Sequence, residues 1–243
     1  MKKVLILGAN SDVAESLAHL LATKGHELIL AGRSIEKLTA LKSDLEIRCN
    51  ATCSTVIFDA ENLDSHQDFY DGLTQKPDWV IAAFGILIEQ DEMIKSAELR
   101  HKSNRVNMVG AISIFDIIAN DFEARKTGVM VGISSVAGDR GRASNYTYGS
   151  AKAAYSAYLS GLRNRLYKSG VHVVTVKPGF IKTKMTEHLE LPTILTASPE
   201  LVASKIEKAI LNKKNIIYVK WFWRYIMLII KMIPESIFKK LKL

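Results

Sequence analysis

The stretch VLILGANSDVAESLAHLLATK, residues 4–24, decides the fold of this 243-residue chain. The four apolar residues Val4–Leu7 predict a buried strand, and Gly8 lets the chain turn tightly behind it. From Val13 to Lys24 the apolar residues recur at helical spacing, which predicts an amphipathic helix. A strand, a turn with glycine and a helix make the first half of a βαβ unit.

The same alternation of short apolar runs and amphipathic stretches continues along the chain. The expected strands are Val4–Leu7, Glu27–Ala31, Thr55–Phe58, Trp79–Ala83, Val129–Ile133, Val171–Val176 and Ile216–Val219, and the expected helices are Val13–Lys24, Ile35–Asp44, His66–Leu73, Ser103–Asn120, Tyr148–Lys168 and Pro199–Asn212. Several strands are apolar on both faces, which suits a parallel sheet covered by helices. We therefore predict an α/β fold with a doubly wound, Rossmann-type parallel sheet that binds ligands at the carboxyl ends of its strands.

The composition fits a single domain over residues 1–220, followed by a basic, apolar tail over residues 221–243. The chain is 48% hydrophobic, and no low-complexity linker or repeat divides it. Cys49 and Cys53 do not match the ligand set of a zinc site, so we expect no metal and two reduced thiols in a cytoplasmic protein. The apolar run after Met1 ends at Gly8, too early for a signal peptide.

The turn after the first strand is a candidate site for the pyrophosphate of a dinucleotide, because free N–H groups at a helix N-terminus bind anions. Its residues are Gly8, Asn10, Ser11, Asp12 and Val13. The loop departs from the dinucleotide fingerprint, since Asp12 and Ala14 stand at the second and third glycine positions. We interpret Asp12 as the N-cap of the helix, with Glu15 completing a capping box, because a carboxylate facing a pyrophosphate would repel it.

The end of the second strand indicates which dinucleotide is bound. NAD-preferring folds place an acid here for the ribose 2′-hydroxyl, whereas an arginine accommodates a 2′-phosphate. This strand runs into Arg33-Ser34 without an acid, so the sequence predicts NADP(H). The alternative is that Arg33 is an ordinary solvated surface residue.

Two further strand ends supply candidate cofactor contacts. Asp59-Ala60 follows the third strand, and the aspartate either caps the adenine edge or only begins the next turn. Ala83-Phe84-Gly85 follows the fourth strand, where small residues would let the backbone approach the cofactor. Phe84 is the bulky exception and is interpreted as a packing residue.

Tyr148 and Lys152, in Tyr148-Gly-Ser-Ala-Lys152, are the main candidates for acid–base chemistry. They lie four residues apart on an expected helix and so point to the same side. A phenol has a pKa near 10, and a neighbouring ammonium favours the phenolate and brings that pKa toward working pH. Such a pair can pass a proton to or from a carbonyl oxygen while a hydride moves. The Tyr148–Lys152 pair is a more specific signal for this chemistry because Ser135 stands at a strand end upstream of it and Asn107 stands in an earlier helix.

Taken in order along the chain, these motifs resemble the short-chain dehydrogenase/reductases. The resemblance runs from about Val4 to Thr183 and includes Pro178-Gly179, Ile181 and Thr183 after the sixth strand. It implies that residues 178–183 lie against the nicotinamide and its carboxamide. It also implies a homodimer or homotetramer.

The resemblance further implies a role for each catalytic candidate. Tyr148 would be the acid/base, and Ser135 would orient and polarise the substrate carbonyl. Lys152 would bind the nicotinamide ribose and lower the pKa of Tyr148. Asn107 would hold a proton-relay water.

A narrower resemblance is to the decaprenylphosphoryl-2-ketoribose reductase group, which reduces a keto sugar carried on a polyprenyl phosphate. It rests on residues 83–87 (AFGIL), residues 134–140 (SSVAGDR) and the tail from residue 224 to residue 241. An acidic residue in the first loop fits this group as well. The resemblance implies a lipid-linked sugar substrate and work at the inner face of the membrane.

The tail is the most basic and most hydrophobic part of the chain. From residue 212 onward it has eight basic residues, Lys242 among them, against one acid, Glu235, and so carries +7 of the net charge of +8. The run Trp221–Ile233 contains Arg224 and Lys231 and is too short to span a bilayer. Aromatic and basic residues together favour peripheral binding to an anionic membrane. The alternative is a helix that packs on its own domain or on a partner subunit, and nucleic acid is not an expected partner.

The sequence leaves three functions open. The first is a membrane-surface reductase of a lipid-linked keto sugar. The second is a soluble reductase of another carbonyl, such as a ketoacyl thioester, whose tail completes a dimer. The third is a catalytically silent NADP-binding sensor or scaffold, against which the intact catalytic set argues.

Overall fold

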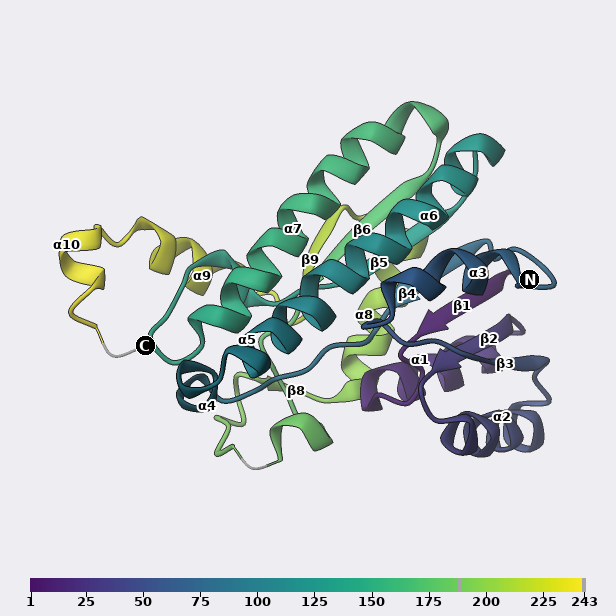
Figure 1. Cartoon of the computed structure of the whole chain (residues 1–243), viewed down its shortest axis with the longest axis horizontal. Helices are drawn as coiled ribbons and strands as arrows, with labels where there is room; N and C mark the ends of the chain where they lie inside the picture. The colour runs from purple at the N-terminus through teal and green to yellow at the C-terminus, as the bar shows by residue number, and fades with distance from the viewer. Residues whose placement is uncertain (188, 242–243) are drawn as a thin grey trace.

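The computed structural model describes residues 1–187 and 189–241 and is built around a parallel sheet of seven strands (Figure 1). The strands of this sheet are β1 Lys3–Leu7, β2 Glu27–Gly32, β3 Cys53–Ile57, β4 Trp79–Ala82, β5 Val129–Ile133, β6 His172–Lys177 and β9 Ile216–Tyr218. Their order is β3-β2-β1-β4-β5-β6-β9, and all neighbours are parallel. The strand order reverses between β1 and β4, so the doubly wound, Rossmann-type fold is confirmed.

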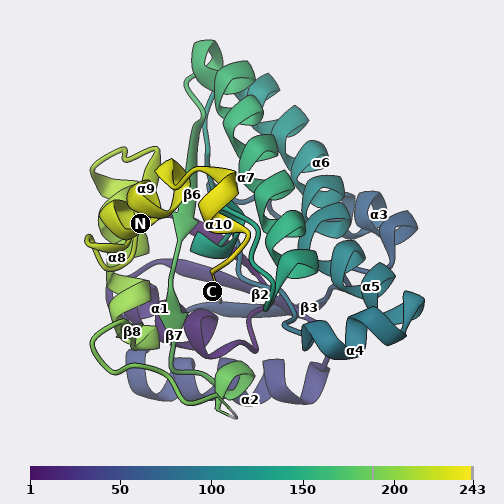
Figure 2. The same ribbon diagram turned by 90° about the vertical axis from the view of Figure 1, so that its left-hand side faces the viewer.

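Helices cover both faces of the sheet (Figure 2). They are α1 Asp12–Thr23, α2 Ile35–Cys49, α3 His66–Asp71, α4 Gln90–Lys95, α5 Ala97–Asn104, α6 Gly110–Arg125, α7 Tyr146–Leu166 and α8 Pro199–Leu211. One apolar core lies between the sheet and α1, α2 and α8, and a second lies between the sheet and α3, α6 and α7. Ile6 belongs to the first core and Leu5 to the second, which explains why β1 is apolar without alternation.

The helix expected over Ser103–Asn120 is instead part of α5 and α6, which are joined by a π-helical turn, Arg105–Val109. The spacing of apolar residues does not reveal such a turn. A π-helical turn adds one residue to the helix, and this only rotates the apolar face of the helix that follows it. Two further features, α4 and a small sheet formed by β7 Phe180–Ile181 and β8 Thr196–Ala197, are not among the elements predicted from the sequence. These segments are too short to show a period.

The tail begins with α9 Trp223–Met232, whose inner face packs on the body. Trp223 and Met227 are buried there against Val136. Arg140 fixes the far end of the helix, since its guanidinium donates hydrogen bonds to Ile230 O at 2.7 Å and to Ile233 O at 2.6 Å. The tail is therefore joined to the body along the whole of α9.

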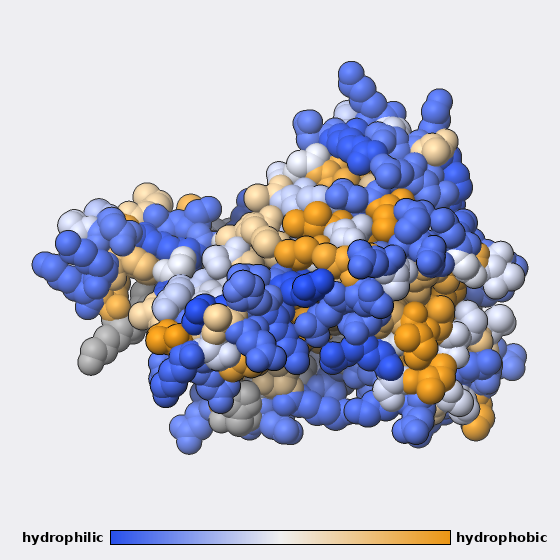
Figure 3. All heavy atoms as spheres, viewed as in Figure 1, coloured by the Kyte–Doolittle hydropathy of each residue, from blue (hydrophilic) through white to orange (hydrophobic). Residues whose placement is uncertain are grey.

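The outer face of α9 is apolar and exposed. Its large exposed side chains are Tyr225, Leu228, Ile229 and Met232, at a spacing that puts them on one side of the helix, and the exposed Trp221 lies in the turn before it. A last short helix, α10 Glu235–Phe238, follows, and the projection formed by α9 and α10 mixes apolar and hydrophilic surface (Figure 3). Lys242 of the basic tail lies outside the described residues. None of the helices in the described part of the chain is long and apolar enough to cross a membrane.

Candidate active site

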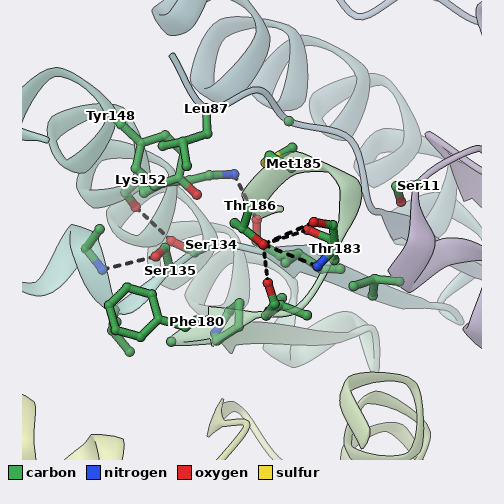
Figure 4. A pocket seen from close by; sticks show the side chains of 18 of the residues that line it. Ser11, Leu87, Ser134, Ser135, Tyr148, Lys152, Phe180, Thr183, Met185 and Thr186 are labelled. Atoms are coloured by element: carbon green, nitrogen blue, oxygen red, sulfur yellow. Dashed lines mark hydrogen bonds between the residues drawn. The ribbon is translucent and has the colours of Figure 1, made fainter. Parts of the chain in front are cut away.

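Two adjoining cavities open at the carboxyl ends of the central strands. The α7 cavity, about 410 Å³, contains Ser135, Tyr148 and Lys152, and the β2 cavity, about 340 Å³, contains Arg33. Asn10 lines both. Figure 4 shows the three α7-cavity residues together at one end of that cavity and Ser11 at the opposite end. The cavities thus extend from the turn after β1 to the first turns of α7.

Gly8 lets the ends of β1 and β4 approach each other at the point where the strand order reverses. Its φ is 81°, and a Cβ there would stand 2.7 Å from the backbone nitrogen of Phe84. The Phe84 ring packs on Phe58, with 5.5 Å between the ring centroids, while the residue also borders both cavities. Phe84 is therefore a packing residue, as interpreted from the sequence, and it is also part of the cavity wall.

The N-cap of α1 is Ser11, and the interpretation of Asp12 as the cap is wrong. Ser11 Oγ accepts a hydrogen bond from Ala14 N at 3.3 Å and donates one to Ala83 O at 3.1 Å. Asp12 is already the first helical residue, and its carboxylate accepts a hydrogen bond from Lys184 N at 2.7 Å. Serine and aspartate cap helices about equally well, so only the backbone conformation shows which residue does so.

Asn10 lies between the two cavities with its side-chain amide unsatisfied. Both the nitrogen and the oxygen of this amide are buried and have no hydrogen-bond partner among the described residues. Buried polar groups in proteins are almost always paired. A nucleotide, whose ribose and phosphates offer donors and acceptors, fits this environment.

The β2 cavity has two cations at its border. Arg33 is largely exposed, and its guanidinium lies 3.9 Å from the carboxylate of Glu61. Ser34 caps α2 by accepting a hydrogen bond from Lys37 N at 3.4 Å, and Lys37 lines the same cavity. Lysine and arginine side chains at one strand end form a suitable environment for a phosphate.

The other expected cofactor contacts also lie at the cavities. Asp59 and Ala60 line the β2 cavity, and Asp59 Oδ1 accepts a hydrogen bond from Glu61 N at 3.0 Å, so the aspartate does begin a turn. The α7 cavity is lined by Val13, Ala83, Gly85, Pro178, Gly179, Ile181 and Thr183. The two halves of the expected contact set thus line two adjoining cavities.

Ser134 and Ser135 have separate surroundings. Ser134 Oγ donates a hydrogen bond to Lys152 O at 2.9 Å and lies 2.7 Å from Ser156 Oγ, which fastens the end of β5 to α7. Ser135 Oγ lies in the cavity, where it accepts a hydrogen bond from Ala137 N at 3.1 Å and bonds to the Tyr148 phenol. The geometry therefore joins Ser135, rather than Ser134, to the tyrosine.

The first turns of α7 place Tyr148 at the cavity wall and bury Lys152 beneath it. Lys152 Nζ lies 5.8 Å from the centre of the Tyr148 ring and donates a hydrogen bond to Ile133 O at 3.1 Å. Burial raises the pKa of Tyr148 to about 12, against the opposing effect of the Ser135 hydrogen bond. Burial also lowers the pKa of Lys152 to about 8.

The expected lowering of the Tyr148 pKa by Lys152 is therefore not present in the protein alone. The ammonium is directed at a carbonyl of β5, and loss of hydration around the phenol is the larger effect. The protein consequently holds Tyr148 as a neutral phenol at neutral pH. A neutral phenol is a proton donor.

Asn107 is buried in the π-helical turn and does not line either cavity. Its side-chain nitrogen donates hydrogen bonds to Ile86 O at 2.8 Å and Ser103 Oγ at 3.3 Å, and its oxygen accepts one from Ile86 N at 3.1 Å. The Asn107 amide thus fixes the segment that follows β4. A Cβ on Gly85 would stand 3.0 Å from this amide oxygen and 3.5 Å from Lys152 Nζ.

Comparisons with known proteins show the family of this chain. Residues 2–192 match the model of the short chain dehydrogenase family. The chain belongs to that family. It is also 30% identical over 241 residues to an uncharacterized oxidoreductase of Mycobacterium tuberculosis, covering 98% of this chain and 96% of that protein. Membership makes the chain an oxidoreductase that acts on an alcohol or a carbonyl with a nicotinamide cofactor.

Two solved structures of this fold illustrate the similarity. A short-chain dehydrogenase from Sphingobium yanoikuyae in complex with NADPH has a TM-score of 0.84 and 21% identity, covering 94% of this chain and 92% of that one. An actinorhodin polyketide ketoreductase with NADPH has a TM-score of 0.82 and 18% identity, covering 91% and 97%. At these identities the similarity concerns the fold.

Several residues of this short-chain dehydrogenase site were missed by sequence reasoning. They are Lys37 at the β2 cavity and Arg142, Asn145 and Trp223 at the α7 cavity. Lys37 and Arg142 could have been identified from the sequence, since each is a cation within a few residues of an expected strand end or catalytic residue. Trp223 could not have been identified in this way, because its place in the cavity wall depends on how α9 folds back onto the body.

Proposed function

We propose that this chain is an NADPH-dependent reductase of a keto group, with Tyr148 as the proton donor. The observation that carries this proposal is the cluster of Ser135, Tyr148 and Lys152 at one end of the α7 cavity, where loss of hydration raises the pKa of the Tyr148 phenol to about 12 and so keeps it protonated at neutral pH. A protonated tyrosine suits reduction, because the carbonyl oxygen must gain a proton as its carbon gains a hydride.

The cofactor would lie along the two cavities. The turn from Gly8 to Val13 would hold its pyrophosphate, and Asn10 would pair with its ribose or phosphates. Arg33, Ser34 and Lys37 would hold a 2′-phosphate, which is why we assign NADPH rather than NADH. When bound, NADPH supplies the hydride.

The protein's own residues supply the proton and orient the substrate. Ser135 donates a hydrogen bond to the substrate carbonyl, and Tyr148 gives its proton to the same oxygen. Lys152, which is charged below a pKa of about 8, would bind the nicotinamide ribose and stabilise the phenolate that remains. The side chain of Asn107 is committed to Ile86 and Ser103, so in this arrangement it fixes the segment after β4, and the water-holding role implied by the family resemblance stays a prediction.

The substrate we infer is a keto sugar carried on a polyprenyl phosphate. One helix, α9, supports this inference, because Trp223 lines the α7 cavity while Leu228 and Ile229 on the outer face are exposed. A helix with an apolar outer face and flanking basic residues suits the surface of an anionic membrane. The α7 cavity would then open beside the lipid, at the inner face of the membrane, in a homodimer or homotetramer.

The experiment that tests the proposal is a substrate panel with the purified full-length chain. NADPH oxidation would be followed with a polyprenyl-phosphoryl keto-pentose, a simple ketone and a ketoacyl thioester, with Tyr148→Phe as the control. We expect the highest kcat/KM with the lipid-linked sugar. Highest activity with the thioester would favour the second candidate function, and no turnover with any carbonyl would favour a silent NADP-binding protein.

A further inference from the structure

Two partly exposed polar side chains in the wall of the α7 cavity each have one buried atom without a hydrogen-bond partner among the described residues. They are Arg142, at its Nε, and Asn145, at its Oδ1, and neither atom has a hydrogen-bond partner among the described residues. Both residues belong to the loop between β5 and α7, and both line the cavity that contains Ser135 and Tyr148. One atom is a donor and the other an acceptor.

Asn145 is unsatisfied because another residue performs its usual task. It stands at the N-cap position of α7, where an asparagine oxygen normally accepts a hydrogen bond from the first helical turn. Here Thr147 N donates to Gln90 Oε1 at 2.9 Å instead, and Gln90 Nε2 donates to Thr147 Oγ1 at 3.0 Å. The glutamine from α4 caps the helix and leaves the asparagine oxygen in the cavity wall.

Arg142 is held in place by the tail but has no ion pair. One of its terminal nitrogens lies 3.2 Å from Met227 Sδ, on the inner face of α9. Among the described residues no carboxylate forms an ion pair with it, and Asp139, the acid of the same loop, is bound to Lys177 and to the Tyr218 hydroxyl. A partly buried guanidinium without an anion is unfavourable, and an anionic ligand would relieve it.

The neighbouring arginine shows the contrast. Arg140 is saturated by carbonyls at the end of α9 and by Glu235, at 2.8 Å, and its guanidinium lies over the Phe238 ring. Arg140 therefore anchors the tail, whereas Arg142 presents unused donor capacity to the cavity. The two arginines are two residues apart and differ in what they contact.

We propose that Arg142 and Asn145 form a substrate-recognition pair for an anionic, hydroxylated carbonyl compound. Arg142 binds an anionic oxygen of the substrate, a phosphate or a carboxylate, and Asn145 Oδ1 accepts a hydrogen bond from a substrate hydroxyl. Asn145 N donates to Arg142 O at 3.1 Å, so one turn of the loop carries both groups. The proposal rests on the proposed reductase function and specifies the substrate class of the same cavity.

The test compares substrates that share the reacting carbonyl. A keto-pentose, its phosphate ester and a keto acid of similar size would be assayed with the wild type, Arg142→Met, Arg142→Lys and Arg48→Met. Arg48 lies exposed on α2 in an ion pair with Asp44, so Arg48→Met removes the same charge far from the cavity. We expect the wild type to prefer the anionic substrates over the neutral sugar by about 10- to 100-fold in kcat/KM.

In Arg142→Met this preference should collapse to about unity, Arg142→Lys should keep part of it, and Arg48→Met should keep all of it. Preference for the phosphate ester or for the keto acid would show which anion is bound. A wild type that reduces neutral and anionic substrates equally well, or an Arg142→Met variant that keeps the preference, would overturn the proposal.

A binding measurement separates this proposal from the reductase itself. Calorimetric titration of the keto-pentose phosphate into Tyr148→Phe, with and without Arg142→Met, reports recognition without turnover. We expect Arg142→Met to weaken binding by at least tenfold. If binding needs Arg142 but the wild type reduces no carbonyl, the reductase proposal fails and the recognition pair stands. If binding is equally tight without Arg142, the recognition pair fails.

Discussion

A Cβ atom on Gly179 would stand 2.1 Å from the indole ring of Trp223. The glycine after β6 therefore admits the first residue of α9 to the wall of the α7 cavity, where Trp223 Nε1 donates a hydrogen bond to Leu195 O at 3.2 Å. Pro178-Gly179 was expected to face the nicotinamide, and in the protein Gly179 also receives the tail. The cavity and the tail are thus one packing unit.

Gly179→Ala should displace α9 and destabilise the protein by about 1–3 kcal/mol, the usual cost of overpacking. Reductase activity should fall with it, because Trp223 would leave the cavity wall. Urea unfolding and kcat/KM would measure the two effects. Gly161→Ala, on α7, is the control and should be neutral or slightly stabilising, because its added Cβ would meet no described atom within 4 Å other than those of its chain neighbours and its own helix backbone. Equal stability of the Gly179→Ala variant and the wild type would contradict the packing argument.

Tyr148→Phe should reduce turnover by about 10²-fold or more, the scale of lost acid–base catalysis. The substitution removes only the hydroxyl that bonds to Ser135, so NADPH binding, followed by fluorescence titration, should remain nearly unchanged. Near-normal turnover in the purified variant would rule out Tyr148 as the proton donor.

The pH dependence of reduction should be set by Lys152 rather than by Tyr148. Burial lowers the pKa of Lys152 to about 8, so its ammonium is charged below that pH and is lost above it. Tyr148, with a pKa raised to about 12, stays protonated throughout. We expect kcat/KM to be level in the acidic and neutral range and to fall above pH 8. In Lys152→Arg, whose guanidinium keeps its charge, residual activity should lack this fall. A level wild-type profile through pH 10 would refute the assignment.

Cofactor choice should depend on Arg33. Wild type should prefer NADPH over NADH in kcat/KM, and Arg33→Ala should narrow that preference by about 1–3 kcal/mol, the size of a charge-assisted hydrogen bond. Because Arg33 is exposed and lies near Glu61, we expect its loss to narrow the preference by an amount in the lower half of that range. Lys37, which lines the same cavity, should account for the preference for NADPH that remains. Lys42→Ala, on α2 beside Glu46, is the control and should leave the ratio unchanged. Equal use of both cofactors by the wild type would exclude a 2′-phosphate site.

The sequence predicts those parts of the molecule in which a local signal decides the structure. β1 is apolar without alternation from Val4 to Leu7 because both of its faces are buried there, and Tyr148 and Lys152 share a helix face because they are four residues apart. Both features depend only on residues that are close together in the sequence. The doubly wound sheet follows from repeating the first pattern along the chain.

What the sequence could not show depends on contacts between distant segments or on solvation. Ser11 rather than Asp12 caps α1 because of the backbone conformation at that turn, and both residues suit the position. The pKa of Tyr148 is raised rather than lowered because the surrounding fold removes water from the phenol. Asn145 is released from capping only because α4, a helix too short to predict, brings Gln90 to Thr147.

The outer face of α9 should bind anionic membranes. Full-length protein should co-sediment with vesicles that contain phosphatidylglycerol more than with pure phosphatidylcholine vesicles. High salt should weaken this binding without abolishing it, because charges near the surface contribute about 1 kcal/mol each and are screened, whereas buried apolar area is not screened. The double substitution Leu228→Gln and Ile229→Gln should release the protein, since these two exposed side chains lie at the middle of the apolar outer face.

The matched control is Ile47→Gln, which removes an exposed apolar side chain on α2, away from the tail. It should leave vesicle binding unchanged, and all variants should keep wild-type unfolding curves. If α9 instead packs against a partner subunit, the double substitution should lower the mass measured by sedimentation velocity. The wild-type protein should then not bind vesicles. Wild-type protein that stays in the supernatant with anionic vesicles at low salt would show that the membrane assignment is wrong. The lipid-linked substrate would then lose its structural support, while the roles proposed for Ser135, Tyr148 and Lys152 would stand on their own geometry.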